Sequence, residues 1–140
     1  MLGSDGDNVE LSRKVPMRAL VVEDVQHDLI RITTLLESLA FSVEAVVDPD
    51  RAKFLFLQNN FDIAVVHIRN MPNRGLEFTK WMRSRTQMPI LMFTDKDSTI
   101  SNDMCLNFGA DDFMVKPINK RTFAKRLNDQ LNFVDIGFAS

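Results

Sequence analysis

The amino-acid sequence predicts an α/β domain with a five-stranded parallel sheet that helices cover on both faces. Five short runs rich in Val, Ile, Leu and Phe recur along the chain, and each is followed by a segment whose apolar residues are spaced by three and four. Short apolar runs are typical of buried strands, and the longer spacing is typical of amphipathic helices. Strands that are apolar on both faces and alternate with helices favour a doubly wound parallel sheet.

The predicted strands cover residues 17–23, 42–47, 62–67, 89–94 and 112–115. A helix is predicted after each strand, because apolar residues repeat there at helical spacing. Gly109 is predicted to end the fourth helix. The residues that mark the five helices are, in order, Leu29, Ile32, Leu36 and Leu39; Ala52, Leu55 and Phe56; Phe78 and Met82; Met104, Cys105 and Phe108; Phe123, Leu127 and Leu131.

The length of 140 residues and the apolar fraction of 45% indicate one globular domain. We place this domain at residues 17–133, after a polar arm at 1–16 and before a tail or linker at 134–140. No apolar run approaches the roughly 20 residues that span a bilayer. The single cysteine, Cys105, cannot form an internal disulfide, and its apolar neighbours indicate core packing, which fits a cytoplasmic protein.

The charge of the chain argues against a general affinity for polyanions. The formal net charge is −2 and the pI is about 5.6. A protein of this charge has no overall field that attracts nucleic acid or an anionic membrane. We therefore expect no membrane contact, and nucleic-acid binding only through a separate domain.

Polar residues gather where the predicted strands end. In doubly wound sheets, ligand chemistry takes place at the carboxyl ends of the strands. The residues at these ends are Glu23 and Asp24, then His67, then Thr94 and Asp95, and finally Lys116.

Four short motifs stand in the order and spacing of a known family: VVED (21–24), VVH (65–67), LMFT (91–94) and GADDFMVKP (109–117). Over residues 17–132 the chain resembles the receiver domain of two-component response regulators. The resemblance implies a flavodoxin-like, CheY-like (βα)5 fold with strand order 2-1-3-4-5. It also implies a role in signal transduction and not in catalysis.

The resemblance also assigns roles to the residues at the strand ends. In the family an acidic pair binds Mg²⁺, an Asp after the third strand accepts a phosphoryl group, and a Thr or Ser and a Lys contact the phosphate. Glu23 and Asp24 match the acidic pair, Thr94 the hydroxyl and Lys116 the lysine, but His67 stands at the phosphoacceptor position. The chain therefore resembles a pseudo-receiver, which lacks the aspartate that is phosphorylated.

Charge suggests what His67 does in this position. Glu23, Asp24 and Lys116 sum to −1, and a protonated His67 would bring the pocket to zero without a metal ion. We expect His67 to replace both the phosphoacceptor and the cation, so that Mg²⁺ and other cofactors are not required.

Other roles for His67 stay open at this point. The ring could be a neutral side chain in an inactive pocket, or a phosphorylated histidine. It could also bind Zn²⁺ or Mn²⁺ together with Glu23 and Asp24, as a metal-responsive switch. A further alternative is phosphorylation at some other residue.

Three more residues near the pocket depart from the family pattern. Asp95 replaces a small residue and is expected to repel phosphate at the pocket entrance. Arg69 could cover the pocket or pair with a carboxylate. Phe113 occupies the position of the family's switch aromatic and is expected to stay buried.

Without phosphoryl chemistry, the signal would leave the protein through a surface. The family's output surface consists of the fourth helix, the fifth strand and the fifth helix, where Asp112 and Arg126 match a pair that crosses a symmetric dimer and Lys125 adds positive charge. The same residues could simply form a solvated charged face. A second candidate contact is Phe54, which helical spacing places on the exposed side of its helix. We expect the partner to be another protein or a second copy, and the chain to be a stand-alone receiver or the regulatory part of a longer regulator such as a transcription factor.

Overall fold

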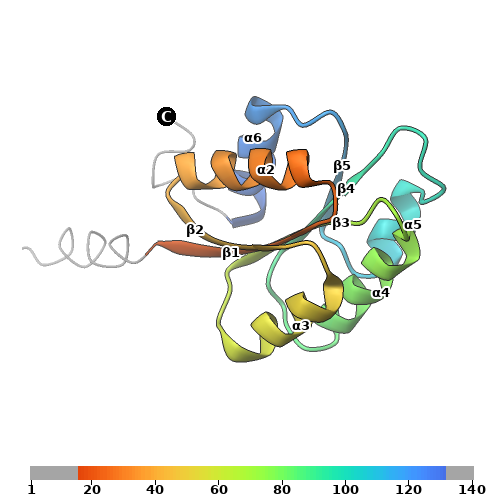
Figure 1. Cartoon of the computed structure of the whole chain (residues 1–140), viewed down its shortest axis with the longest axis horizontal. Coiled ribbons are helices and arrows are strands. Elements are labelled where there is room, and N and C mark those ends of the chain that lie inside the picture. Colours follow the sequence, from red (N-terminus) through yellow and green to blue (C-terminus); the bar gives the residue numbers. More distant parts are fainter. Residues whose placement is uncertain (1–15, 132–140) are drawn as a thin grey trace, which may run out of the picture.

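The computed structural model describes residues 16–131 of the chain. Apart from Pro16, the predicted arm at 1–16 lies outside the described residues, as do the tail at 134–140 and the last two residues of the predicted domain. Figure 1 shows the described part as one sheet between two layers of helices.

The five strands form a single parallel sheet in the order β2-β1-β3-β4-β5, which confirms the predicted topology. Each predicted strand agrees with the structure to within one residue at either end. The strands are β1 (Met17–Glu23), β2 (Phe41–Val46), β3 (Ile63–His67), β4 (Ile90–Thr94) and β5 (Asp112–Val115).

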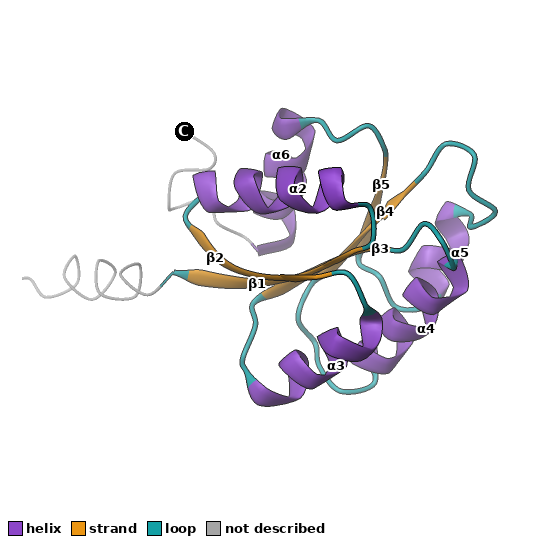
Figure 2. Ribbon diagram, in the orientation of Figure 1, coloured by secondary structure: helices purple, strands orange, loops and turns teal. Residues whose placement is uncertain are grey.

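The helices of the described residues alternate with the strands. They are α2 (Gln26–Ser38), α3 (Pro49–Gln58), α4 (Pro72–Arg83), α5 (Asn102–Asn107) and α6 (Lys120–Leu131). Helices α2 and α6 cover one face of the sheet, and α3, α4 and α5 cover the other (Figure 2). No helix of residues 16–131 is long and apolar enough to cross a membrane.

The core has two halves because alternate residues of each strand point to opposite faces of the sheet. In β1, Ala19 and Val21 pack toward α2 and α6, whereas Leu20 and Val22 pack toward α3, α4 and α5. All four are fully buried. This is why the predicted strands are apolar without alternation.

The register of the sheet brings the carboxyl ends of the strands into line. Glu23 at the end of β1 lies opposite His67 at the end of β3. The backbone N–H of Lys116 donates to the carbonyl of Thr94 at 2.8 Å, so the segment after β5 continues beside the end of β4. Four strand ends therefore place their side chains at one edge.

Gly109 ends the turn after α5, as its position in the sequence predicts. Its φ is +116°, a conformation that residues with a side chain rarely adopt. A Cβ at this position would lie 2.7 Å from the Cβ of Arg83, which itself donates from Nε to the Gly109 carbonyl at 2.8 Å. Both the backbone and the packing require glycine here.

We expect Gly109→Ala to lower the free energy of unfolding by about 2 kcal/mol, because it adds both a strained φ and a steric overlap. Urea unfolding measures this loss. Gly75→Ala is the matched control: Gly75 lies in α4, and its added Cβ would be 3.4 Å from Ile68 Cγ1. That variant should change stability by less than about 1 kcal/mol. Equal effects of the two changes would contradict the assignment.

Candidate functional site

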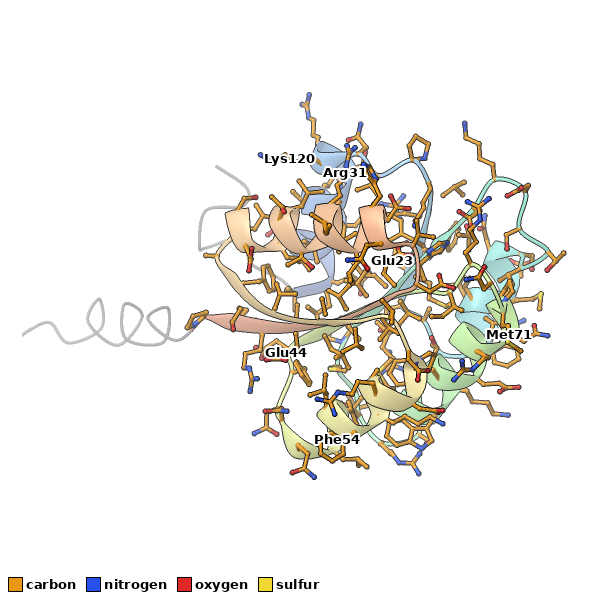
Figure 3. The ribbon with its side chains drawn as sticks, viewed as in Figure 1. Glu23, Arg31, Glu44, Phe54, Met71 and Lys120 are labelled. Atoms are coloured by element: carbon orange, nitrogen blue, oxygen red, sulfur yellow. The ribbon has the colours of Figure 1, made fainter. Side chains whose placement is uncertain are left out.

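Charged side chains from β1, α2, β3 and the segments that follow β4 and β5 meet at the carboxyl edge of the sheet. We call this group the His67 cluster; it consists of Glu23, Asp28, His67, Asp95 and Lys116. Figure 3 shows the labelled Glu23 at the end of β1 where this edge begins. Sequence analysis singled out four of the five members, and Asp28 is the addition.

The His67 ring is buried and lies between two carboxylates. Its side chain is 2% exposed. Nδ1 lies 2.5 Å from Glu23 Oε2, and Nε2 lies 2.8 Å from Asp95 Oδ2. Since a carboxylate only accepts hydrogen bonds, both contacts are best satisfied when each ring nitrogen carries a proton.

The environment of His67 raises its pKa above the ordinary value. Burial of the ring lowers the pKa, because it penalises the charged form. The hydrogen bond and charge of Glu23 and the hydrogen bond of Asp95 raise the pKa and outweigh burial, while the positive charge of Lys116 opposes them. The structure therefore favours an imidazolium that donates to both carboxylates.

Lys116 is held inside the same cluster. Its Nζ donates to Glu23 Oε1 at 2.8 Å and to Asp28 Oδ2 at 2.6 Å, and it lies 2.9 Å from His67 Nδ1. Glu23, which is fully buried, thus bridges two cations with its two oxygens. Lys116 follows β5 directly, at a Lys116–Pro117 peptide bond that is cis.

Asp28 lies in the first turn of α2 and completes the balance of charge. Burial raises the pKa of its carboxyl. The hydrogen bonds and charges of Lys116 and His27 lower the pKa by more than burial raises it, so the net shift is downward. An ionised Asp28 with Glu23 and Asp95 gives three negative charges against Lys116 and a protonated His67. Arg69, whose Nη1 lies 3.9 Å from Asp95 Oδ1, brings the sum to zero.

The observed balance of charge uses different carboxylates from the predicted one. Asp24 was expected to share the pocket charge with Glu23, but its two oxygens accept the backbone N–H groups of Arg69 at 2.7 Å and Asn70 at 2.9 Å. Asp95, which is expected to repel phosphate at the entrance, is also a direct partner of His67, a contact that the sequence does not predict. The expectation that Arg69 pairs with a carboxylate agrees with its approach to Asp95.

The missed residue, Asp28, has a weak signal in the sequence. It is an acid in the first turn of the helix that starts directly after the acidic pair, so it faces the same edge of the sheet. A single acid near a helix start is more commonly read as favourable to the helix dipole, which hides its contact with Lys116.

Thr94 lies at the end of β4, beside the ring of His67. Its side chain is buried, and it lines a cavity of about 10 Å³ together with His67 and Asp95. A cavity of this volume holds about one water molecule. Phe113, expected to stay buried, is half-buried and lines a shallow groove near Arg126.

The residues predicted for an output surface lie where the sequence places them, with one difference. Arg126 Nη1 lies 2.5 Å from Asp112 Oδ1 of the same chain, so the pair expected across a dimer is closed within one molecule. Lys125 pairs with Asp129 at 3.2 Å on the exposed side of α6. Phe54 is 53% exposed, as predicted.

The donor set at the edge does not fit the Mg²⁺ that the family resemblance implies. Ligand atoms of Glu23, Asp24 and His67 lie within 4.8 Å of one another. Mg²⁺ prefers oxygen ligands in octahedral geometry, but one of these donors is an imidazole nitrogen that has a lysine ammonium 2.9 Å away. Both Glu23 oxygens are also engaged by His67 and Lys116, and both Asp24 oxygens by backbone amides.

Comparisons of the sequence with family models and with curated proteins indicate the same family. Residues 19–128 match the family model of the response regulator receiver domain. The transcriptional regulatory protein YcbL of Bacillus subtilis is 28% identical over 100 residues, which cover 71% of this chain and 44% of that protein. The sensory transduction protein RegX3 of Mycolicibacterium smegmatis is 30% identical over 108 residues, or 77% of this chain and 47% of RegX3.

Solved structures agree with the observed fold. The chemotaxis protein CheY4 of Vibrio cholerae superimposes with a TM-score of 0.73 at 27% identity, over 84% of this chain and 100% of that one. The chain spans about half the length of the curated relatives named above.

The pKa of His67 predicts how stability depends on pH. Because the pKa of His67 is higher in the folded chain than in the unfolded chain, protonation of the ring stabilises the fold, and this stabilisation is complete below about pH 6.5. This stabilisation is lost as the pH rises through the folded-state value, by up to about 1.4 kcal/mol per pH unit. NMR titration of the ring and urea unfolding at several pH values measure the two quantities.

The variant His67→Gln should no longer lose folding stability as the pH rises through this range. His27→Gln is the matched control, because it removes the other of the chain's 2 histidines, which is 83% exposed. This control should lose stability with rising pH as the wild type does. A His67 pKa below about 6.5, or a loss that persists in His67→Gln, would contradict the assignment of an imidazolium.

Proposed function

Because the chain belongs to the response regulator receiver domain family, we propose that it is a pseudo-receiver, which signals through protein contacts without phosphorylation of an aspartate. Receiver domains act in two-component signal transduction and bind protein partners. The observation that carries the proposal is His67 at the end of β3, hydrogen-bonded on both sides to carboxylates.

The contacts at the carboxyl edge support the proposal that no carboxylate there accepts a phosphoryl group. An acyl phosphate needs a carboxylate with a free oxygen and room for the phosphoryl group. Glu23 and Asp95 are both engaged by His67, and the cavity beside the ring measures about 10 Å³. The other carboxylate near β3, Asp62, lies at the far end of the strand and accepts the backbone N–H of Arg18 at 2.7 Å.

The same geometry argues against phosphorylation of His67 itself. A histidine attacks phosphorus with the lone pair of a neutral ring nitrogen. Both nitrogens of His67 face carboxylates and are expected to carry protons. If Nδ1 lost its proton, the Lys116 ammonium 2.9 Å away would donate to the lone pair, so neither nitrogen is free to attack. Transfer to the ring would require Glu23 or Asp95 to move away first.

A metal-responsive switch is supported less well than a fixed charge cluster. Zn²⁺ or Mn²⁺ at Glu23, Asp24 and His67 would have to displace Lys116 and the proton on Nδ1. The cluster as it stands is neutral without a metal when Arg69 is included. We therefore propose that the charge of His67 takes the place of the cation.

We further propose that the output is self-association or partner binding through the surface of α5, β5 and α6. Val115 and Leu106 are 45% and 43% exposed there, beside a groove of about 280 Å³ that Phe113 and Arg126 line. The names of the curated relatives, which this chain matches over about half their length, support a regulatory part of a longer regulator such as a transcription factor.

The test for phosphorylation is incubation with acetyl phosphate and Mg²⁺, followed by intact-mass spectrometry. We expect no phosphoryl adduct, and no change in the amide NMR spectrum with beryllofluoride and Mg²⁺. An adduct that disappears in His67→Ala or Asp95→Asn would overturn the proposal.

The variant His67→Asp serves as the positive control for metal binding. It replaces an imidazolium with a carboxylate, so Mg²⁺ affinity should rise at least tenfold over the wild type in an NMR titration. Wild-type protein that binds Mg²⁺ as tightly as this variant, or binds Zn²⁺ through His67 in calorimetry, would contradict the assignment of a self-neutralised cluster.

The test for self-association is size-exclusion chromatography with light scattering. If α5, β5 and α6 form the contact, Arg126→Glu should raise the dimer dissociation constant at least tenfold, since it places a second acid beside Asp112. Glu37→Lys, a charge reversal on the exposed side of α2, is the control and should leave it unchanged. If both variants have the same dimer dissociation constant, the surface of α5, β5 and α6 is not the dimer contact.

A further inference from the structure

The outer side of α3 and α4 carries a set of cations that lie over aromatic rings. We call this region the α3–α4 surface; it consists of Arg51, Lys53, Phe54, Leu57, Trp81 and Arg85. Arg85 Cζ lies 4.2 Å from the ring centroid of Trp81, and Lys53 Nζ lies 5.5 Å from it. Arg51 Cζ lies 5.3 Å from the Phe54 ring. A fourth contact, Arg18 over Phe61 at 5.1 Å, adjoins the surface.

Three of these cations form no ion pair within residues 16–131: no carboxylate lies within 4.0 Å of the charged groups of Arg51, Lys53 and Arg85. Arg18 differs, because its backbone N–H donates to Asp62 at 2.7 Å. The acids near the start of α3, Asp48 and Asp50, pair with Arg74 instead. Of the remaining acids, Glu77 is an exposed residue of α4 without an ion pair. Arg51, Lys53 and Arg85 therefore keep their charges free of direct ion pairs, in a chain whose net charge is −2.

Apolar side chains accompany the cations. Phe54 and Leu57 are 53% and 64% exposed and lie three residues apart, on one side of α3. Figure 3 shows the labelled Phe54 on the side of α3 that points away from the sheet. Trp81 is half-buried and packs against Phe56, with ring centroids 5.3 Å apart.

A groove of about 490 Å³ lies beside these residues at the ends of α3 and α4. Its lining is mixed, with apolar Phe56, Leu57, Phe61 and Met88 and polar Asn59, Asn60, Arg85 and Thr86. Arg85 lines the groove and also lies over Trp81, so the groove adjoins the cations of the α3–α4 surface. The groove is large enough to take apolar side chains of a partner, and its rim would attract acids.

The chemistry of the rings distinguishes between two kinds of anionic partner. Single-stranded nucleic acid binds by stacking bases on free aromatic faces. Here Arg85 and Lys53 lie over Trp81, and Arg51 lies over Phe54, so these faces are already used. A guanidinium that stacks on a ring keeps its N–H groups at the edge, where they can bind carboxylates in pairs. Arg85 Nη1 already donates to the Trp81 carbonyl at 3.0 Å and to Ser84 Oγ at 2.9 Å, so its other N–H groups and those of Arg51 would meet the partner.

We propose that the α3–α4 surface is a docking site for an acidic segment of a partner protein, anchored by apolar side chains in the groove. The surface is separate from the His67 cluster and from the surface of α5, β5 and α6. The inference therefore does not depend on how the receiver is activated.

The probe is a synthetic peptide of Glu and Asp with Leu and Phe at helical spacing, titrated into isotope-labelled protein. We expect amide NMR shifts confined to α3, α4 and the groove, and an affinity that weakens as salt increases. A peptide with Lys in place of the acids should bind at least tenfold more weakly. A uridine oligonucleotide should not shift the same amides.

Two variants test which groups carry the binding. The double variant Arg51→Glu with Lys53→Glu should weaken peptide binding at least tenfold, and Phe54→Ser with Leu57→Ser should do the same through loss of apolar contact. These side chains are outside the core, and unchanged thermal unfolding would show that the fold is retained. The control is Lys120→Glu with Arg121→Glu on α6, which makes the same change in net charge at exposed positions.

Four outcomes would overturn the proposal, and the first three concern the peptide and the oligonucleotide. They are amide shifts that fall outside α3 and α4, equal weakening by the α6 control, and tighter binding of the oligonucleotide than of the acidic peptide. Loss of dimerisation in the same variants, with no effect on the peptide, would indicate a contact between copies and would also overturn it. Phosphorylation of the wild type would leave the proposal unaffected, which separates the two tests.

Discussion

The arrangement at the carboxyl edge depends on one hydrogen-bonded bridge, in which the His67 ring joins Glu23 to Asp95. A buried carboxylate such as Glu23 is costly unless cations or donors surround it. His67 and Lys116 provide both on its two oxygens, and Asp28 and Asp95 then balance the added positive charge. Removing any one member would take one partner from a neighbouring charge, so the effects of substitutions within the cluster are expected to be coupled.

Much of the fold and part of this site could be predicted from the sequence. Strand limits, sheet order and the meeting of Glu23, His67, Thr94 and Lys116 follow from apolar runs and from the family motifs. The choice between Asp24 and Asp95 as partner of His67 could not be predicted. It depends on side-chain rotamers and on backbone amides of the loop before α4, which take up the oxygens of Asp24.

Two features of the surface show the limits of sequence patterns in the same way. Helical spacing identifies Phe54 as exposed, but the cations that lie over aromatic rings come from α3 and from the segment after α4, and they come together only when the helices lie next to each other. The family pattern identifies Asp112 and Arg126 as a pair, but only the structure shows that they meet within one chain. Patterns therefore locate candidate residues better than they locate partners.

The participation of Asp28 and Asp95 has a consequence for redesign of the pocket. An aspartate at position 67 would leave four carboxylates around one lysine, and it would not remove Asp95 from the pocket entrance. Effects of substitutions in direct contact are strongly coupled, so each further change toward an acidic pocket would depend on the others. Conversion of this edge into a cation site would therefore require several substitutions made together.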